Sequence, residues 1–341
     1  MKILVGMSGG VDSTAAALLL QQQGHTVGGL TLHLNDGPST DRDDARRVAA
    51  QLGIEHTVLD LRDDFRRLVK QPFGTAYQQG LTPNPCIECN RHIKFGKMLD
   101  WALEHGYDAV ATGHYARITK DNGRYLLRRA DDPKKDQSYV LYSLTQHQLS
   151  HAVFPLCEYD KPQLRTLLEE KGLITAHKSD SQDICFVPDG DYMAFLAREL
   201  DIHGRPGRYL DTDGRVIGTH RGVEAYTVGQ RKGLGVAFGE PRFVVRKNAA
   251  DNTVTLGKHD DLFSQMLLAH DANWIAMERL TQPTVCTART RYNQVATPAV
   301  VYPLDDTRFR VEFEQPQRAV TPGQAVVLYQ DDVVLGGGRI C

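Results

Sequence analysis

Hydrophobic and polar residues alternate along the first part of the chain in a rhythm of short apolar runs and amphipathic stretches. Strands are predicted at 2–6, 26–34, 54–59 and 108–112, and helices at 12–23, 41–52, 62–79 and 91–105. A repeated strand–helix–strand order is typical of a doubly wound parallel sheet, and so predicts an α/β fold. Ligands of such sheets bind beyond the carboxyl ends of the strands, which predicts where a functional site lies.

The pattern changes twice further along. Residues 120–200 show more helical spacing, at 145–149 and 161–171, and from about 203 glycines multiply between short β-prone runs. Short alternating runs then predict a small all-β barrel or sandwich, with strands at 283–292, 297–302, 309–313, 324–330 and 333–339. We therefore expect a first domain at 1–200 with a helical extension, a small central domain at 201–261 and a C-terminal β-barrel at 262–341.

Composition narrows the class of protein. The 341 residues include 40 Lys and Arg against 42 Asp and Glu, which gives a net charge of −2 and excludes a uniformly basic nucleic-acid coat. The hydrophobic content of 41% excludes a disordered or collagenous chain. Six cysteines are too few for a secreted disulfide framework, and no signal peptide or membrane-spanning run is visible. The expectation is a cytoplasmic enzyme whose cysteines stay reduced, bind metal or do chemistry.

The strongest local motif stands between the first predicted strand and the first predicted helix. It reads Gly6-Met7-Ser8-Gly9-Gly10-Val11-Asp12-Ser13. Adjacent glycines let backbone N–H groups converge on an anion, and the helix N-terminus adds positive potential. The two serines can donate hydrogen bonds, and the aspartate can help to hold Mg²⁺. The spacing is that of neither a Walker A loop nor a dinucleotide fingerprint.

Three cysteines form a second candidate site. Two lie in Thr82-Pro83-Asn84-Pro85-Cys86-Ile87-Glu88-Cys89-Asn90, and the third lies in Ser181-Gln182-Asp183-Ile184-Cys185-Phe186. Prolines stiffen the first segment, and Cys89 stands just before a predicted helix, whose N-terminus is expected to lower the thiol pKa. A structural zinc site with His92 as a fourth ligand is an open alternative. We interpret Cys157 and Cys286 as small buried hydrophobic residues.

The first motif resembles the PP-loop of ATP pyrophosphatases, which cleave ATP between its α and β phosphates and adenylate an oxygen. Together with further segments, the chain resembles the MnmA family of bacterial tRNA-specific 2-thiouridylases. The segments that carry this resemblance are 6–13, 82–95, 111–117 (ATGHYAR), 135–139 (KDQSY), 181–186, 226–235 (YTVGQRKGLG), 290–292 (TRY) and 321–324 (TPGQ). They follow in order over nearly the whole chain.

The resemblance implies ATP- and Mg²⁺-dependent 2-thiolation of the wobble uridine of tRNA, with sulfur supplied by a cysteine desulfurase or a sulfur carrier protein. It implies a PP-loop domain, a central domain and a β-barrel. Cys89 would be the nucleophile, Cys185 would carry a persulfide, and a disulfide between them can follow. The other implied site residues are Gly6, Met7, Ser8, Gly9, Gly10, Val11, Asp12, Ser13, Leu32 and Gly113 for ATP; Asn84, Pro85 and Cys86 for the target base; and His114, Lys135, Asp136, Gln137, Arg291, Tyr292 and Gln324 for tRNA.

One position departs from the family. Cys86 stands where many members have an aspartate that is proposed to assist proton transfer at the base. Cys86, Cys89 and Cys185 could instead hold a [4Fe–4S] cluster whose open iron carries hydrosulfide, so the persulfide and cluster routes both remain. Two other classes also remain: a PP-loop adenylating enzyme with a different acceptor, and a non-catalytic RNA-binding iron–sulfur protein.

Overall fold

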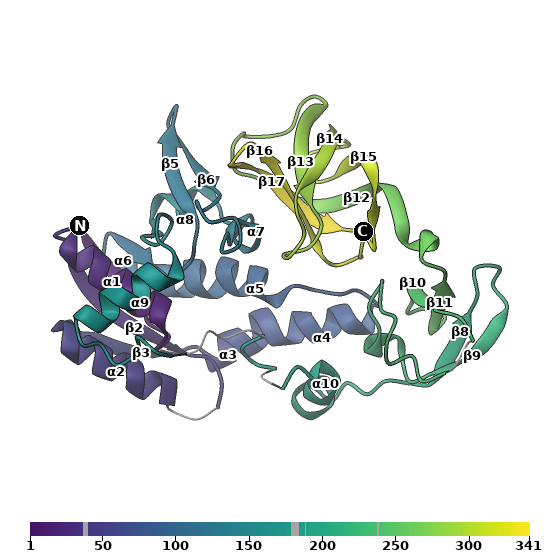
Figure 1. Ribbon diagram of the computed structural model, residues 1–341, viewed down its shortest axis with the longest axis horizontal. Coiled ribbons are helices and arrows are strands. Elements are labelled where there is room, and N and C mark those ends of the chain that lie inside the picture. Colours follow the sequence, from purple (N-terminus) through teal and green to yellow (C-terminus); the bar gives the residue numbers. More distant parts are fainter. Residues whose placement is uncertain (37–39, 179–183, 188, 237–238) are drawn as a thin grey trace. The chain divides into compact units, whose positions relative to one another are not determined.

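The computed structural model describes residues 1–36, 40–178, 184–187, 189–236 and 239–341 (Figure 1). The chain divides into two compact units. Unit 1 comprises Met1–Leu68, Cys86–Phe186 and Asp332–Val334, and unit 2 comprises Val69–Pro85, Val187–Asp331 and Leu335–Cys341. None of the described helices is long and apolar enough to cross a membrane.

Unit 1 is built on a five-stranded parallel sheet in the order β3-β2-β1-β4-β7. Its strands are β1 (Lys2–Gly6), β2 (Thr26–His33), β3 (His56–Asp60), β4 (Ala109–Ala111) and β7 (Ala152–Val153). The order changes direction at β1, because β2 lies on one side of it and β4 on the other. This confirms the predicted doubly wound sheet and puts the carboxyl end of β1 at the switch point, where ligands bind in such folds.

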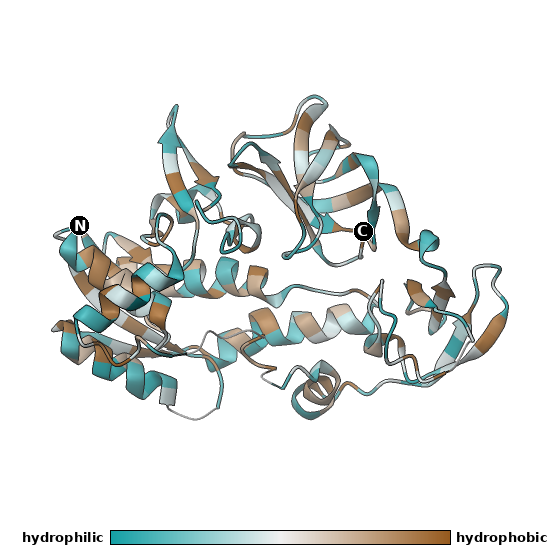
Figure 2. Ribbon diagram, in the orientation of Figure 1, coloured by the Kyte–Doolittle hydropathy of each residue, from teal (hydrophilic) through white to brown (hydrophobic). Residues whose placement is uncertain are grey.

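The helices that connect these strands differ in the face they bury. Helix α1 (Val11–Gln22) is buried along most of its length because its middle is a run of alanines and leucines. Helix α2 (Thr40–Leu52) buries only Ala45, Val48 and Ala49 and is hydrophilic elsewhere (Figure 2). Helix α9 (Lys161–Glu170) shares the hydrophobic core of α1 through Leu164 and Leu168 and begins at a capping box of Asp160 and Gln163. The first residue of α9 therefore lies beside the start of α1.

Two longer helical stretches contain π-helical turns. The first runs through α3 (Arg62–Phe65), η1 (Arg66–Lys70) and α4 (Gln71–Gln78), and the second through α5 (Pro85–Glu88), η2 (Cys89–Lys97) and α6 (Met98–Glu104). The predicted helix at 91–105 thus begins six residues too late, because Pro85 opens the helix rather than ending a loop. Proline suits the first helical position, where an N–H has no intrahelical partner.

A β-hairpin was missed in the region predicted to be helical. Strands β5 (Arg117–Asp121) and β6 (Arg124–Arg128) are joined by Asn122 and Gly123, which both have positive φ, of 47° and 83°. Asn-Gly at a two-residue turn is a strong hairpin signal, so the sequence did carry the information. The remaining helices of unit 1 are α7 (Ser138–Leu141) and α8 (Gln146–Ser150), the latter close to the predicted 145–149.

Unit 2 contains a four-stranded sheet and a β-barrel, besides helices α10 (Tyr192–Leu200), η3 (Val223–Ala225) and η4 (Asp260–Leu262). The sheet has the order β10-β11-β8-β9, with β8 (Gly207–Leu210), β9 (Val216–His220), β10 (Phe243–Asn248) and β11 (Thr253–Gly257). The barrel strands are β12 (Phe263–Trp274), β13 (Thr284–Arg289), β14 (Thr297–Pro303), β15 (Phe309–Arg318), β16 (Ala325–Gln330) and β17 (Val333–Ile340). Antiparallel pairing of β12 with β17 closes the barrel and confirms the prediction.

The longest barrel strand, β12, was absent from the predicted set. Its pairing register shifts between Ser264 and Met266 and again between His270 and Asn273, and Asp271 has a φ of 54°. Each irregularity reverses which side chains face the core. The simple alternation that revealed the other barrel strands is therefore lost along β12.

Candidate active site

The glycine-rich loop follows β1 directly and leads into α1, as the sequence predicted. The Ser8 N–H donates to Ser13 Oγ at 3.1 Å, and the Ser13 hydroxyl donates to the Gly10 carbonyl at 3.2 Å. Gly9 has a φ of 72°, and a Cβ there would clash with the Asp41 carbonyl oxygen. No described side chain caps the N-terminus of α1 at Gly10, so its first N–H groups suit an anion.

Asp12 in this loop is held by two residues that sequence reasoning did not assign. Its Oδ1 accepts hydrogen bonds from the Tyr115 hydroxyl at 2.8 Å and from Lys161 Nζ at 2.6 Å. Lys161 is the first residue of α9 and its side chain is only 12% exposed. Gly113 packs so closely on the loop that a Cβ there would lie 2.7 Å from Asp12 Cβ. Residues 111–117 therefore contact the loop directly, and Lys161 brings a positive charge to it.

A second lysine, Lys178, lies near the start of α2, where the Asp41 backbone approaches Gly9 of the loop. Lys178 Nζ contacts the Asp41 carboxylate at 2.7 Å and the Asp44 carboxylate at 2.8 Å. Arg165 fixes the backbone here by donating to the Lys178 carbonyl at 2.8 Å. Leu32, predicted to line the nucleotide site, is half-buried near the carboxyl end of β2. Lys161 at Asp12 and Lys178 at the start of α2 thus both have carboxylate partners, which phosphate oxygens can replace.

The cysteine helix, by which we mean α5 together with η2, carries Cys86 and Cys89 in different surroundings. Cys86 is exposed and Cys89 is buried. Burial raises the pKa of Cys89 to about 12; Lys94 opposes this rise, while Cys185 and Cys86 add to it. Although part of the Cys86 residue reaches solvent, the surrounding protein desolvates its thiol and raises the pKa of Cys86, again opposed by Lys94. The predicted lowering of the Cys89 pKa is therefore wrong, because Cys89 lies inside a helix and away from solvent rather than at its first turn.

Cys185 acts on the Cys89 thiol electrostatically although the two are far apart in sequence. It adds to the rise of the Cys89 pKa, and both residues belong to unit 1. Cys185 itself is exposed, and the adjacent Phe186 packs edge-to-face on Phe65 with ring centroids 5.6 Å apart. Residues 181–183 of the motif around Cys185 lie outside the described residues. The three predicted thiols are brought together in one unit with the phosphate loop.

The π-helical form of η2 has a visible cause. The side chain of Gln148 donates from Nε2 to the carbonyls of Arg91 and Phe95, both at 2.8 Å. An amide inserted into the helix ladder satisfies carbonyls that the wider i→i+5 turns leave without their usual partner. Wider turns also bring residues five apart onto nearly the same face. Lys94 follows Cys89 by five residues, which explains why its charge acts on that thiol.

His114 is buried and does not lie at a surface that RNA could reach directly. Its Nδ1 contacts Thr112 Oγ1 at 2.7 Å, and its ring packs near Phe95 and Phe154. Burial lowers its pKa well below the ordinary value, and the positive charge of Lys94 lowers it further. The imidazole is therefore neutral at pH 7, and its contact with tRNA stays a prediction.

Residues 135–137, also predicted to contact tRNA, make internal bonds. The Asp136 carboxylate accepts from the Ser138 N–H and hydroxyl, both at 3.0 Å, at the start of α7. Gln137 Oε1 accepts from the Tyr115 N–H at 3.0 Å. Lys135 is half-buried. These residues link α7 to the segment that contacts Asp12, whatever else they bind.

The other predicted tRNA residues, Arg291, Tyr292 and Gln324, belong to unit 2, as do Asn84 and Pro85. Arg291 Nη2 donates to the Val228 carbonyl at 2.9 Å and to Thr321 Oγ1 at 2.6 Å. The Tyr292 carbonyl accepts a hydrogen bond from Arg289 Nη2. Gln324 Nε2 donates to the Thr82 carbonyl at 2.9 Å. Arg291 and Gln324 thus hold protein backbone, and their RNA contacts stay predictions.

Metal binding has limited support in the described residues. Among them, no group of three or more His, Cys, Asp or Glu side chains is arranged to hold a metal ion. His92, considered as a fourth zinc ligand, instead lies 3.4 Å from the Glu88 carboxylate. Asp12 fits the protein share of a Mg²⁺ site, because Mg²⁺ commonly takes one or two carboxylates together with phosphate oxygens.

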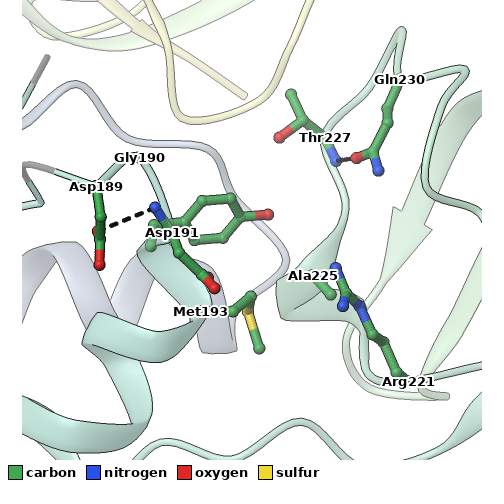
Figure 3. Close-up of a pocket in the computed structure, with 9 residues that line it drawn as sticks. Asp189, Gly190, Asp191, Met193, Arg221, Ala225, Thr227 and Gln230 are labelled. Atoms are coloured by element: carbon green, nitrogen blue, oxygen red, sulfur yellow. Dashed lines mark hydrogen bonds between the residues drawn. The ribbon is translucent and has the colours of Figure 1, made fainter.

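Unit 2 also contains an open cavity of about 460 Å³ between the start of α10 and the loop after η3 (Figure 3). Thr227 and Gln230, which belong to the YTVGQRKGLG segment, lie across it from Asp189 and Asp191 and on the same side as Arg221. The Thr227 N–H donates to Gln230 Oε1 at 3.0 Å. The predicted ATP and sulfur residues do not line this cavity. Its mixed charges, two aspartates and one arginine, give no preference for phosphate.

Comparison with known families covers almost the whole chain. Residues 1–189 match the tRNA methyl transferase HUP domain, residues 193–258 the tRNA methyl transferase PRC-barrel domain, and residues 264–340 the aminomethyltransferase β-barrel domain.

Curated relatives match at full length. The chain is 48% identical to the tRNA-specific 2-thiouridylase MnmA of Acetivibrio thermocellus, with 99% of each chain covered. It is 45% identical to tRNA-specific 2-thiouridylase MnmA 1 of Clostridium botulinum and 44% identical to the MnmA of Clostridium acetobutylicum, again with 99% of each chain covered.

Proposed function

Because the chain belongs to the MnmA family of tRNA-specific 2-thiouridylases, we propose that it replaces the C2 oxygen of the wobble uridine of tRNA by sulfur, using ATP. The observation that carries the proposal is that the unit that holds the phosphate loop also holds Cys86, Cys89 and Cys185, with Cys185 acting electrostatically on Cys89. We assign ATP and sulfur chemistry and a helical tRNA-binding extension to residues 1–200, and further RNA positioning to residues 201–261 and 262–341. A cytoplasmic location is part of the proposal.

The first step activates the uridine. Gly6–Ser13 bind the ATP phosphates, with Leu32 and Gly113 at the nucleotide, and Lys161 and Lys178 exchange their carboxylate partners for phosphate oxygens. Asp12 would then hold Mg²⁺, which neutralises the charge that develops on the pyrophosphate. The C2 oxygen attacks the α-phosphorus, the bond to pyrophosphate breaks, and C2 now carries AMP as a leaving group. Asn84, Pro85 and Cys86 are the residues proposed to receive the base, which must leave the anticodon stack.

The second step transfers sulfur. A cysteine desulfurase or sulfur carrier first converts Cys185 to a persulfide. The terminal sulfur attacks C2, AMP leaves, and the uridine is joined to Cys185 through an S–S bond. The Cys89 thiolate then attacks Cys185 Sγ, so that this S–S bond breaks, its electron pair forms the C2 thiocarbonyl, and a Cys89–Cys185 disulfide results. A thiol reductant must reduce that disulfide before the next turnover.

The environment of Cys89 sets a requirement on this step. With its pKa raised to about 12, Cys89 is a thiol at pH 7 and must lose a proton before it attacks. Lys94 is the described cation that opposes the rise, and we propose that it stabilises the thiolate as it forms. Burial and the same Lys94 charge disfavour protonation of His114, so His114 stays neutral and we do not assign the Cys89 proton to it.

Two competing readings are tested with the same protein. The first alternative is methyl transfer to tRNA, which is named in the description of the domain family matched by residues 1–189. Methyl transfer needs neither an ATP-cleaving loop nor paired thiols. A [4Fe–4S] cluster on Cys86, Cys89 and Cys185 would deliver hydrosulfide instead of a persulfide. The described cysteines do not form a metal-holding group, so the steps above involve no cluster.

The test is nucleoside analysis of tRNA incubated with the protein, ATP, Mg²⁺ and a persulfide donor. We expect 2-thiouridine and one pyrophosphate per thiolated tRNA, and Cys157→Ser serves as a matched control for a cysteine outside the site. Methylated uridine, or ATP cleavage with no thiolation of tRNA, would overturn the proposal. Iron and sulfide analysis of anaerobically purified protein, followed by assays of Cys86→Ala and Cys86→Asp, separates the persulfide route from the cluster route.

A further inference from the structure

The segment that leads into Asn84 and Pro85 has no regular secondary structure, yet its backbone is tied down by distant parts of unit 2. It follows α4, and its Leu81 N–H closes that helix by donating to the Ala76 carbonyl at 2.8 Å. Thr82 then exchanges two hydrogen bonds with the loop before β16: its N–H donates to the Pro322 carbonyl, and its carbonyl accepts from Gln324 Nε2, both at 2.9 Å. The barrel loop therefore binds both backbone polar groups of Thr82, which belong to the peptides on either side of this residue.

The barrel loop is shaped for this close approach. Gly323 has a φ of 91°, and a Cβ there would lie 2.8 Å from both Leu81 Cβ and the Thr82 nitrogen. Any larger residue would push the loop away from Thr82 as well as strain the backbone. The contact with Leu81 and Thr82 therefore requires glycine at position 323. This requirement indicates a specific contact rather than an incidental one between two loops.

A lysine of the central sheet binds the carbonyl of the Leu81–Thr82 peptide, whose N–H donates to the barrel loop. Lys247, in β10, donates from Nζ to the Tyr226 carbonyl at 2.7 Å and to the Leu81 carbonyl at 3.4 Å. Nζ also lies 5.8 Å from the centroid of the Tyr77 ring. Burial lowers the pKa of Lys247 to about 8, and Glu224 opposes this. Burying an ammonium has a large desolvation cost, so its use to bind two carbonyls indicates a specific role for this junction.

From these contacts we propose that Gln324 and Lys247 are positioning residues, which set the backbone of Leu81–Thr82 and thereby the placement of the target-base residues Asn84 and Pro85. The inference rests on the proposed function, because Asn84 and Pro85 matter only if a base is received there. It changes the role of Gln324, which the resemblance assigns to tRNA contact. An amide has two N–H groups and a carbonyl oxygen, so Gln324 can hold Thr82 and face RNA together.

Coupling between RNA on the barrel and the base-receiving segment follows from this arrangement. RNA that engages the loop around Gln324 shifts or tightens the Thr82 peptide, and two residues later the chain reaches Asn84. Arg291 extends the junction, because its bonds to Val228 and Thr321 join the same barrel loop to the segment that begins at Tyr226. The barrel then acts on the reaction through backbone geometry as well as through affinity.

The test compares Gln324→Met, which keeps the size of the side chain and removes its N–H donors, with Gln265→Met. Gln265 also donates its amide to a barrel carbonyl, that of Phe313, but does not bond to the Leu81–Thr82 backbone. Hydrogen exchange followed by mass spectrometry reads the peptide that covers residues 79–86, in the protein without tRNA. We expect faster exchange there in Gln324→Met and unchanged exchange in Gln265→Met; this result does not depend on any catalytic function.

Activity supplies the second measurement. In Gln324→Met at saturating tRNA, we expect the rate of pyrophosphate release from ATP to fall about tenfold or more. Misplacement of a reacting group by a fraction of an ångström can have an effect of this size. The tRNA Kd should change by about threefold or less, the size of one lost neutral hydrogen bond. Lys247→Arg should keep much of the rate and Lys247→Met should lose it. If wild-type protein releases no pyrophosphate with tRNA, the proposed function fails while the exchange result still stands.

Three outcomes would overturn the positioning role. Unchanged exchange of residues 79–86 in Gln324→Met would show that the Thr82 bond does not order the segment. A loss confined to tRNA affinity, at an unchanged saturating rate, would make Gln324 an RNA contact only. Equal losses in Gln324→Met and Gln265→Met would show a general weakening of the barrel. Where Lys247→Met does not fold, Gln324→Met and Lys247→Arg still decide between these results.

Discussion

The phosphate loop and the cysteine helix lie in the same unit but are built by different means. The loop is shaped by bonds between near neighbours, such as the Ser8 N–H to Ser13 Oγ and the Ser13 hydroxyl to the Gly10 carbonyl. The cysteine helix owes its form and its chemistry to distant residues: Gln148 widens its turns, and Cys185 acts on Cys89. The loop is ready to bind an anion, whereas the thiol of Cys89 is held protonated.

This difference separates the two halves of the proposed reaction. Anion binding needs N–H groups and cations that are already in place, and the loop has both in its helix N-terminus and Lys161. Sulfur transfer needs a thiolate, which burial disfavours at Cys89 until a proton leaves. Adenylation should therefore be independent of the charge arrangement around Cys89, and sulfur transfer should depend on it.

The most damaging change should be made in the loop. Asp12→Ala removes the proposed Mg²⁺ ligand and the partner of Lys161 and Tyr115. We expect tRNA-dependent pyrophosphate release to fall about a hundredfold or more, since electrostatic stabilisation of the leaving phosphates is lost. Release is measured with a coupled pyrophosphate assay at saturating ATP. Asp131→Asn, a change in an exposed ion pair with Arg117, is the control; if it were equally damaging, the loop would have no special role.

A change at Cys185 should separate the two halves. Cys185→Ser removes the proposed persulfide carrier but touches no loop residue, so thiolation should fall below about a hundredth of the wild-type rate while pyrophosphate release stays within about threefold. The pair of measurements is 2-thiouridine by nucleoside analysis and pyrophosphate by the coupled assay. Normal thiolation in this variant would remove Cys185 from the mechanism, and parallel loss of both signals would contradict the independence of the two regions.

The same difference explains what the sequence could predict. The loop, its strand and its helix were predicted nearly to the residue, because neighbouring residues decide their structure. The contact of Lys161 with Asp12 was not, because it joins residues 149 positions apart and depends on how α9 packs on α1. The lowered thiol pKa predicted for Cys89 failed for a similar reason: helix position is local, but burial of Cys89 is a property of the folded unit.

Elements were missed where local signals were outweighed or misread. The hairpin of β5 and β6 carried an Asn-Gly turn, but the helical spacing of its surroundings outweighed it. Strand β12 lost its alternation through two register shifts. The junction at Thr82 could not be predicted at all, because Gln324 and Lys247 reach it from separate sheets, and only the turn chemistry of Gly323 marks the place in the sequence.

Reactivity of Cys89 should show a smaller but specific effect. Because burial raises its pKa to about 12, the rate of Cys89 alkylation should keep rising with pH through 8, 9 and 10, without a plateau near the value of an ordinary thiol. Lys94→Met removes the charge that opposes this rise and should slow alkylation at pH 9 further, about tenfold for each added pKa unit. Mass spectrometry of the peptide that contains Cys89 measures the rate. Lys97→Met is the control, since Lys97 is paired with Asp64; faster alkylation in Lys94→Met would contradict the proposed role of Lys94.

The smallest expected effect concerns the contribution of His114 to the free energy of unfolding. His114 contacts Thr112, and its pKa is affected by the charge of Lys94. Its pKa in the folded chain is lowered well below the ordinary 6.5 by burial, so the unfolded chain binds a proton that the folded chain excludes. The contribution is fully favourable above the unfolded pKa and is lost as the pH falls below about 6.5. We therefore expect the free energy of unfolding to decrease with acidification in the wild type, by at most about 1.4 kcal/mol per pH unit from this one group.

His114→Gln keeps a polar side chain without the titration, so it should flatten the slope between pH 7.5 and 5.5 in urea unfolding experiments. His56 and His220 also have lowered pKa values and continue to titrate in the variant, so only the difference between the two slopes belongs to His114. Identical slopes would show that His114 is not held neutral by the fold.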